Sequence, residues 1–217
     1  MKNEIRKNFI TAAFLFTTFV LWTTAICLID VKPIGPNGSS VGFAAFNAWF
    51  HNLTGVHFSL YHITDWLGLV PVAFCFGFAI LGLAQWICRK KLRLVDRSLF
   101  VLGGYYMVVI ISYFFFESVV INYRPVLIDG FLESSYPSST TLLVLCVMPT
   151  TMEQFKEHIQ KPKVLHVVNG LISLFAVFMV VGRLVSGVHW FSDIVGGMLL
   201  SFALVMLYRT CAALFQE

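Results

Sequence analysis

Three ionisable residues near the end of the chain, Arg183, His189 and Asp193, stand at the mouth of a long apolar run. His189 and Asp193 are four residues apart, so on a helix they share a face and the carboxylate can hold the imidazole. A histidine held in this way can attack phosphorus, and the aspartate stabilises the imidazolium. Arg183 offers forked donors that suit phosphate oxygens. Because ionisable groups are costly near hydrocarbon, we interpret this stretch as functional.

A second polar stretch lies between Asn122 and Ser139 and contains two prolines. Pro125 predicts that a helix ends at Arg124, because the residue before a proline disfavours helical geometry. Pro137 predicts the start of the next helix, whose first turn holds Ser138, Ser139, Thr140 and Thr141. Free N–H groups and the helix dipole make such a turn an anion site. Taken alone, the stretch favours the alternative, an ordinary serine cap.

The composition indicates an integral membrane protein. Of 217 residues, 58% are apolar and 12% are charged, and the mean hydropathy is +0.81. A soluble domain carries about 25% charged residues. The five cysteines are odd in number and lack metal-type spacing, so we interpret them as small apolar residues and predict neither metal nor cofactor. The net charge of +4 does not indicate nucleic-acid binding, because the basic residues follow a membrane topology.

Uncharged stretches predict an all-α fold, a single membrane-embedded domain over residues 1–217 with six spanning helices. No small-residue cleavage site follows the first apolar run, so we interpret it as a span and not as a cleaved signal. The six predicted spans are 8–29, 66–88, 98 to about 123 (interrupted only by Glu117), the stretch between Glu133 and Glu153, 164–182, and about 188–208.

The basic residues predict the orientation. With the N-terminus in the cytoplasm, 12 of the 15 lysines and arginines lie on the cytoplasmic side, as does the C-terminus. Only Lys32, Arg124 and Arg183 remain outside, and an anionic ligand would explain the two arginines. The long outer loop 30–65 carries aromatic residues at helical spacing between Phe43 and Leu53, which predicts a short interfacial helix. The short loops favour a bacterial plasma membrane.

Five residues from separated stretches therefore fall on one extracytoplasmic surface. The set resembles the type 2 phosphatidic acid phosphatase / haloperoxidase superfamily, in its integral-membrane lipid phosphatase branch. That family has a lysine seven residues before Arg-Pro, then Pro-Ser-Gly-His, then Ser-Arg with a histidine six residues on and an aspartate four beyond. The matching positions, in order and spacing, are Arg124-Pro125, Pro137-Ser138, Arg183, His189 and Asp193. The six-helix layout matches as well.

The resemblance implies a role for each matching residue. His189 corresponds to the nucleophile and Asp193 to the residue that orients it, while Arg124, Arg183 and Ser138 correspond to phosphate-contacting positions. Ser139 and Thr140, in the same helical turn as Ser138, belong to the expected phosphate site. The substrate implied is a phosphorylated lipid. The oligomeric state is left open.

The sequence departs from the family's pattern at four positions, two of them in the second motif. Glu117 replaces the family's lysine, Ser139 its glycine, Thr140 its histidine and Gly182 its serine. The family's histidine at position 140 protonates the leaving oxygen, which threonine cannot do near neutral pH; such acid help is worth about 10²–10⁴-fold. Either the leaving group needs little protonation, or another acid substitutes (Asp129, Glu133 or Glu117), or catalysis is lost. Glu117 has an alternative interpretation as a buried carboxylate paired with an arginine.

Three hypotheses follow. The first is an extracytoplasmic lipid phosphatase that works through phospho-His189 on phosphatidic acid, phosphatidylglycerol phosphate or a polyprenyl diphosphate. The second is a catalytically impaired relative that binds phosphorylated lipid head groups without turnover. A transporter or channel is a weaker third, because the sequence shows no inverted repeats.

Overall fold

The computed structural model describes residues 2–215, which fold into a bundle of α-helices. Two single-turn 3₁₀ helices, η1 (Pro36–Gly38) and η2 (Leu92–Leu94), lie in the connections. The α-helices are α1 (Lys2–Leu28), α2 (Ala44–Thr54), α3 (Phe58–Leu67), α4 (Leu69–Arg89), α5 (Arg97–Ser118), α6 (Ser139–His158), α7 (Pro162–Val185) and α8 (Phe191–Phe215). The all-α prediction is confirmed.

Five helical stretches are long and apolar enough to cross a membrane: α1, the pair α3–α4 taken together, α5, α7 and α8. Helix α6 is the sixth long helix but carries more polar residues, and its polar side chains face protein. Thr150 shares a hydrogen bond with the Tyr106 hydroxyl at 3.1 Å, and Gln154 donates to the Tyr208 hydroxyl at 3.1 Å. Because α4, α5, α7 and α8 surround α6, it needs less apolar surface than a helix in contact with lipid.

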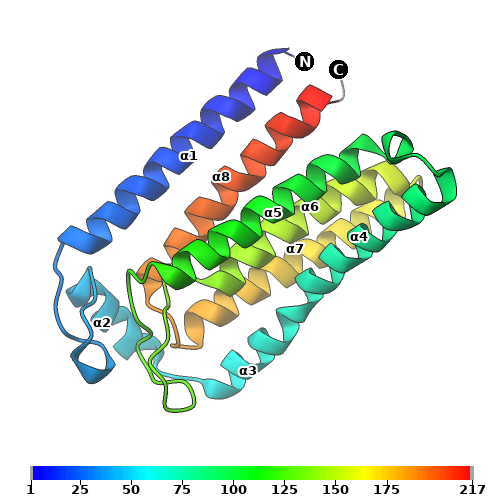
Figure 1. The fold of residues 1–217 in the computed structure, drawn as a ribbon. Coiled ribbons are helices and arrows are strands. Elements are labelled where there is room, and N and C mark those ends of the chain that lie inside the picture. Colours follow the sequence, from blue (N-terminus) through cyan, green and yellow to red (C-terminus); the bar gives the residue numbers. More distant parts are fainter. Residues whose placement is uncertain (1, 216–217) are drawn as a thin grey trace.

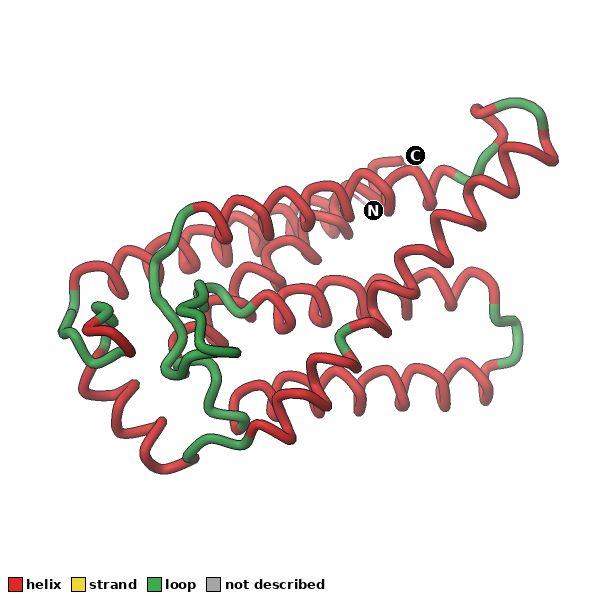
Figure 2. The backbone as a smooth tube through the Cα atoms, turned by 60° about the horizontal axis from the view of Figure 1, so that its bottom comes forward, coloured by secondary structure: helices red, strands yellow, loops and turns green. Residues whose placement is uncertain are grey.

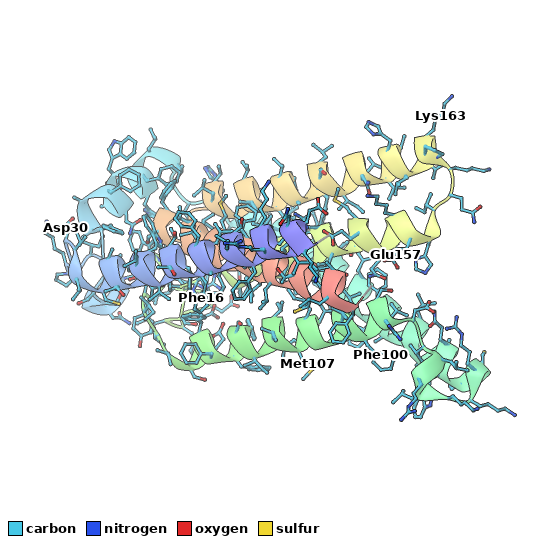
Figure 3. The ribbon with its side chains drawn as sticks, turned by 90° about the horizontal axis from the view of Figure 1, so that it is seen from above. Phe16, Asp30, Phe100, Met107, Glu157 and Lys163 are labelled. Atoms are coloured by element: carbon cyan, nitrogen blue, oxygen red, sulfur yellow. The ribbon has the colours of Figure 1, made fainter. Side chains whose placement is uncertain are left out.

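Helices α1 and α8 pack along their whole length, so the beginning of α1 and the end of α8 lie at the same end of the bundle (Figure 1). The long connection between α5 and α6 folds across the opposite end, close to α2 and α3 (Figures 1 and 2). Figure 3 shows Asp30 at this second end and Lys163 at the first. We call the end that carries Asp30 the loop end and the other the terminal end.

The predicted outer loop 30–65 is largely helical. Its aromatic stretch forms α2, and Phe46, Trp49 and Leu53 are exposed along it. Helix α3, which the sequence does not predict, follows at once and bends into α4 at Gly68. The turns of the loop end are in close contact: Gly187 has φ 70°, and a Cβ there would lie 2.0 Å from the Gly55 carbonyl oxygen. This contact holds the α2–α3 pair against the α7–α8 connection.

Two predicted helix boundaries were wrong. Helix α5 ends at Ser118, not at about Tyr123 or Arg124. The chain beyond it forms a narrow hairpin, in which Arg124 N–H donates to the Glu133 carbonyl at 3.0 Å and Ser135 N–H donates to the Asn122 carbonyl at 2.9 Å. Those backbone pairings replace the helical ones. Helix α6 begins at Ser139 rather than at Pro137, with Ser138 as its N-cap.

Candidate active site

His189 lies in the connection between α7 and α8 and is 3% exposed. Its Nδ1 is 3.1 Å from the carbonyl oxygen of Ser135. A carbonyl only accepts hydrogen bonds, so Nδ1 must carry the proton and Nε2 the lone pair. The Nη1 of Arg124 lies 3.5 Å from that Nε2. The structure therefore brings the lone pair of a neutral imidazole against a guanidinium, where an anionic group could meet both.

The surroundings of His189 keep it neutral. Burial lowers the pKa of His189 well below its ordinary value of 6.5, and the charges of Arg124 and Arg183 lower it further. The hydrogen bond to Ser135 opposes this shift. At pH 7 the imidazole is consequently in the form that can act as a nucleophile.

Asp193 is fully buried in the first turn of α8, and its carboxylate does not hydrogen-bond to His189. The sequence predicted that bond, but the distance from Nδ1 to the carboxylate is 3.9 Å. Other donors occupy the oxygens: Asn122 Nδ2 at 3.0 Å, Ser135 Oγ at 2.7 Å and Trp190 N–H at 2.9 Å. His189 precedes the helix, so the four-residue spacing does not place both side chains on one helical face. Asp193 instead anchors the hairpin that supplies the Ser135 carbonyl.

Arg124, at the base of the same hairpin, is 8% exposed. Its Nε lies 3.0 Å from the carboxylate of Glu133 on the opposite arm. The hydrogen-bonding geometry of that Nε is poor, so the contact is an ion pair rather than an aligned hydrogen bond. The pair leaves the other end of the guanidinium directed at His189.

Arg183 is buried near the end of α7 and is held by α3. Its Nη1 lies 3.3 Å from both the carbonyl oxygen of Tyr61 and the hydroxyl of Thr64, and its Nη2 lies 3.3 Å from the Asp65 carboxylate. The Tyr61 ring faces both arginines, with its centroid 4.8 Å from the guanidinium carbon of Arg183 and 5.9 Å from that of Arg124. One aromatic ring thus accommodates two like charges through cation–π contacts.

The first turn of α6 serves as a cap and as a cavity wall. Ser138 is fully buried, accepts from Thr141 N–H at 3.5 Å and donates its own N–H to the Asp193 carbonyl oxygen at 3.1 Å. The cap interpretation therefore describes Ser138 in this conformation. Ser139 and Thr140 are half-buried and line a cavity of about 400 Å³.

The three candidate acids occupy different environments. Glu117 is exposed and accepts a hydrogen bond from Ser134 Oγ at 2.7 Å, so its interpretation as a buried partner of an arginine was wrong. Glu133 is the partner of Arg124. Asp129 is exposed at the tip of the hairpin, away from His189. Only Glu117 of the three lines the small cavity that His189 also lines.

Two cavities adjoin the site. The one against His189 has a volume of only about 10 Å³, enough for about one water molecule. The 400 Å³ cavity lies beside it and shares Tyr113, Ser139 and Leu142 with it. Its other walls come from α3, α4 and α5, including Asp65, Leu69 and Ile110.

Sequence reasoning missed several residues that build the site. Asn122 and Ser135 hold Asp193, while Tyr61, Thr64 and Asp65 hold Arg183. Asn122 and Ser135 lie within the polar stretch that was singled out, so their position was a usable signal. The three α3 residues carry no such signal, because only the packing of α3 on α7 brings them to Arg183.

Comparisons with known proteins give a family and a related fold. The family model described as the PAP2 superfamily matches residues 72–216. The crystal structure of the first transmembrane PAP2 type phosphatidylglycerolphosphate phosphatase from Bacillus subtilis is similar, with a TM-score of 0.56 and 19% sequence identity over 94% of this chain and 96% of that one. A search of curated proteins found no match. At this identity the structural likeness shows a shared fold.

Proposed function

The chain belongs to the PAP2 superfamily, and from that premise we propose that it is a membrane lipid phosphatase working through phospho-His189. The observation that carries the proposal is the state of His189: a buried, neutral imidazole whose unprotonated Nε2 faces Arg124. A nucleophile needs that lone pair, and a phosphoryl group needs the adjacent cation.

In the proposed reaction, Nε2 of His189 attacks phosphorus as the bond to the lipid oxygen breaks. Arg124 and Arg183 bind the phosphoryl oxygens, and the free N–H groups at the start of α6, beside Ser139 and Thr140, add donors. The imidazolium so formed keeps its Nδ1 proton on the Ser135 carbonyl, with the Asp193 charge 3.9 Å away. Water then attacks the phosphohistidine, releasing phosphate and returning the neutral histidine.

The leaving oxygen needs a proton unless it is already stable as an anion. Glu117 is the candidate donor with the best geometry, because it shares a cavity with His189. Without a donor, the proposed site suits a diphosphate ester of a lipid, whose leaving group is itself a phosphate monoester. Phosphatidic acid, phosphatidylglycerol phosphate and a polyprenyl diphosphate are the candidate substrates.

The proposed topology has six spans, α6 included, with both termini cytoplasmic and the loop end extracytoplasmic in a bacterial plasma membrane. The excess of lysine and arginine at the terminal end supports it. The 400 Å³ cavity supports lipid binding at the loop end, because its walls are mostly apolar and it adjoins Ser139 and Thr140. A lipid chain would occupy this cavity while its phosphate reached His189.

The test compares purified wild-type protein with His189→Gln for phosphate release from the three candidate lipids, together with acid-quench trapping of phosphohistidine. We expect release and trapping in the wild type and neither in the variant. Equal release by both proteins would refute the proposal.

A second candidate function, binding of a phosphorylated lipid without turnover, is supported by Thr140, which stands where the family has its acid. Thr140→His discriminates between the two. A phosphatase should gain hydrolysis of monoesters, whereas a binding protein should show none. The binding hypothesis also predicts weaker lipid binding in Arg183→Gln, and a trapped phosphohistidine would exclude it.

A further inference from the structure

A large cavity lies at the terminal end, away from His189. It has a volume of about 730 Å³ and forms a groove between α5 and α8. Its α5 wall includes Phe100, Gly104 and Val108, and its α8 wall includes Leu207 and Phe215. Figure 3 shows Phe100 toward the end of the bundle that carries Glu157 and Lys163, away from Asp30. The groove is therefore separate from the candidate active site.

The dimensions of the groove match one leaflet of a bilayer. Along α5 it runs from Arg97 to Val108, which is about 16 Å at 1.5 Å per residue. Half of a hydrocarbon core of about 30 Å is about 15 Å. The volume is also in the range of about 300–1,000 Å³ typical of small-molecule sites.

The charge of the groove is confined to one end. Arg93 and Arg97 are both exposed and line its mouth, whereas the residues along its length are apolar or tyrosine, with one cysteine and one glycine. Nearby acids are engaged elsewhere: Asp96 pairs with Arg89 at 2.8 Å and Glu153 with Arg209 at 2.6 Å. Glu157 shares a small adjoining recess with Arg97, so the local charge is positive but not unopposed.

Two arginines at headgroup depth above an apolar channel one leaflet long are complementary to a lipid with a phosphate head and acyl chains. We propose that this groove binds an anionic glycerophospholipid of the leaflet at the terminal end, at a site distinct from the candidate active site. A second copy of the chain would fill the apolar part of the groove but would leave both arginines without an anionic partner. The lipid accounts for both features.

Two glycines in consecutive positions of α5 provide a matched pair of variants. A Cβ added at Gly104 or at Gly103 meets nothing within 4 Å, so either position accepts a side chain without disturbing the bundle. Only Gly104 lines the groove. Gly104→Leu therefore fills the groove, and Gly103→Leu makes the same chemical change outside it.

The experiment is native mass spectrometry of the purified full chain titrated with phosphatidylglycerol or with phosphatidylcholine. We expect wild type and Gly103→Leu to retain phosphatidylglycerol in preference to phosphatidylcholine. Gly104→Leu and the double variant Arg93→Gln/Arg97→Gln should each lose about tenfold or more of that retention. Arg183→Gln, which alters the candidate active site, should retain it. A variant whose only cysteine is Cys211, which lines the groove, should be protected from alkylation by phosphatidylglycerol.

Equal retention of the two lipids, or unchanged retention in Gly104→Leu, would overturn the proposal. So would loss of retention in Arg183→Gln alone, because that would assign the bound lipid to the loop end. A dimer that Gly104→Leu dissociates, with no change in bound lipid, would assign the groove to a second copy. The double arginine variant changes exposed residues only, so it reads out the site even if Gly104→Leu fails to fold.

Discussion

The hydrogen-bond partner of His189 is a backbone carbonyl, whereas the spacing of the motif predicts a carboxylate. The Ser135 carbonyl fixes the imidazole tautomer, and Asp193 fixes the hairpin that presents this carbonyl. The position of this backbone carbonyl depends on the conformation of the hairpin that carries it. The hydrogen bonds that Asp193 receives from Asn122, Ser135 and Trp190 therefore indirectly determine the position of the proposed nucleophile.

Removing one of these bonds tests whether Asp193 acts by holding the hairpin that presents the Ser135 carbonyl. Ser135→Ala deletes the 2.7 Å bond to the buried Asp193 carboxylate, and a hydrogen bond to a charged group is worth about 1.5–3 kcal/mol. We expect lower thermal stability and a lower kcat with a smaller change in KM, because the arginines proposed to bind phosphate remain. The measurements are thermal unfolding in detergent and steady-state phosphate release. Ser112→Ala is the control: its exposed hydroxyl bonds only within α5 and should change neither quantity. An unaltered kcat in Ser135→Ala would contradict the assignment.

The lowered pKa of His189 predicts the acid limb of the pH profile. The proposed reaction needs neutral His189, whose pKa lies well below 6.5. We therefore expect protonation of His189 to lower kcat/KM only when the pH is well below 6.5. Arg124→Gln removes a neighbouring cation that lowers this pKa, so the acid limb should move to higher pH at reduced overall activity. The shape of the profile is the readout. An acid limb at the same pH in both proteins would contradict the prediction.

The same shift couples folding to pH. The unfolded histidine binds a proton near pH 6.5, whereas folded His189 does not, so the unfolded state holds more protons as the pH falls below that value. Stability contributed by keeping His189 neutral is present above pH 6.5 and is lost as the pH falls toward the folded pKa.

At the scale of elements, the contact between α3 and α7 decides the position of Arg183. A Cβ at Gly182 would lie 2.8 Å from the Thr64 methyl carbon, and Thr64 has little freedom to move. Its hydroxyl already contacts the Leu60 and Tyr61 carbonyls and Arg183. A side chain at position 182 would therefore require α3 to move away from α7.

Gly182→Leu should push α3 from α7 and release Arg183 from Thr64. We expect KM for the lipid to rise, and thermal stability to fall by about 1–3 kcal/mol because of overpacking. Gly170→Leu is the matched control in the same helix, where a Cβ meets nothing within 4 Å, and it should be neutral or stabilising. Kinetics and thermal unfolding of the two variants provide the measurement. Equal effects in both would show that the α3–α7 contact does not position Arg183.

The positions of most helices follow from the sequence, but their ends do not. A membrane span is recognised from the average hydropathy of about 20 residues, so α1, α4, α7 and α8 were predictable from composition alone. The end of α5 was not, because the five residues after Ser118 have no strong helix breaker. The backbone of Asn122 and Tyr123 pairs instead with Ser135 and Ser134, more than ten residues away. Helix α3 was missed because most of it precedes Trp66, where the uncharged stretch of the second predicted span begins. Residue types identified His189, Asp193 and both arginines, but hydrogen-bond partners such as the Ser135 carbonyl carry no sequence signature.

At the scale of the whole molecule, the two ends of the bundle are chemically different. The terminal end carries most of the lysines and arginines together with the groove between α5 and α8, and the loop end carries the buried arginines beside His189. The cations of the terminal end are exposed, whereas Arg124 and Arg183 are buried and paired with Glu133 and Asp65. In the proposed topology, burial and pairing explain how two arginines lie on the side that the positive-inside rule disfavours.

This polarity predicts the orientation in the membrane. In a cysteine-free background, Asp129→Cys at the hairpin tip should react with a membrane-impermeant thiol reagent on intact bacteria, whereas Lys161→Cys between α6 and α7 should react only after permeabilisation. Both positions are exposed, so a difference in labelling reports the side of the membrane and not burial. The two positions are joined through α6 alone, so opposite labelling also establishes that this least apolar of the long helices crosses the bilayer. Labelling of both cysteines on intact cells would contradict the spanning of α6, and the reverse pattern would place the site on the cytoplasmic side.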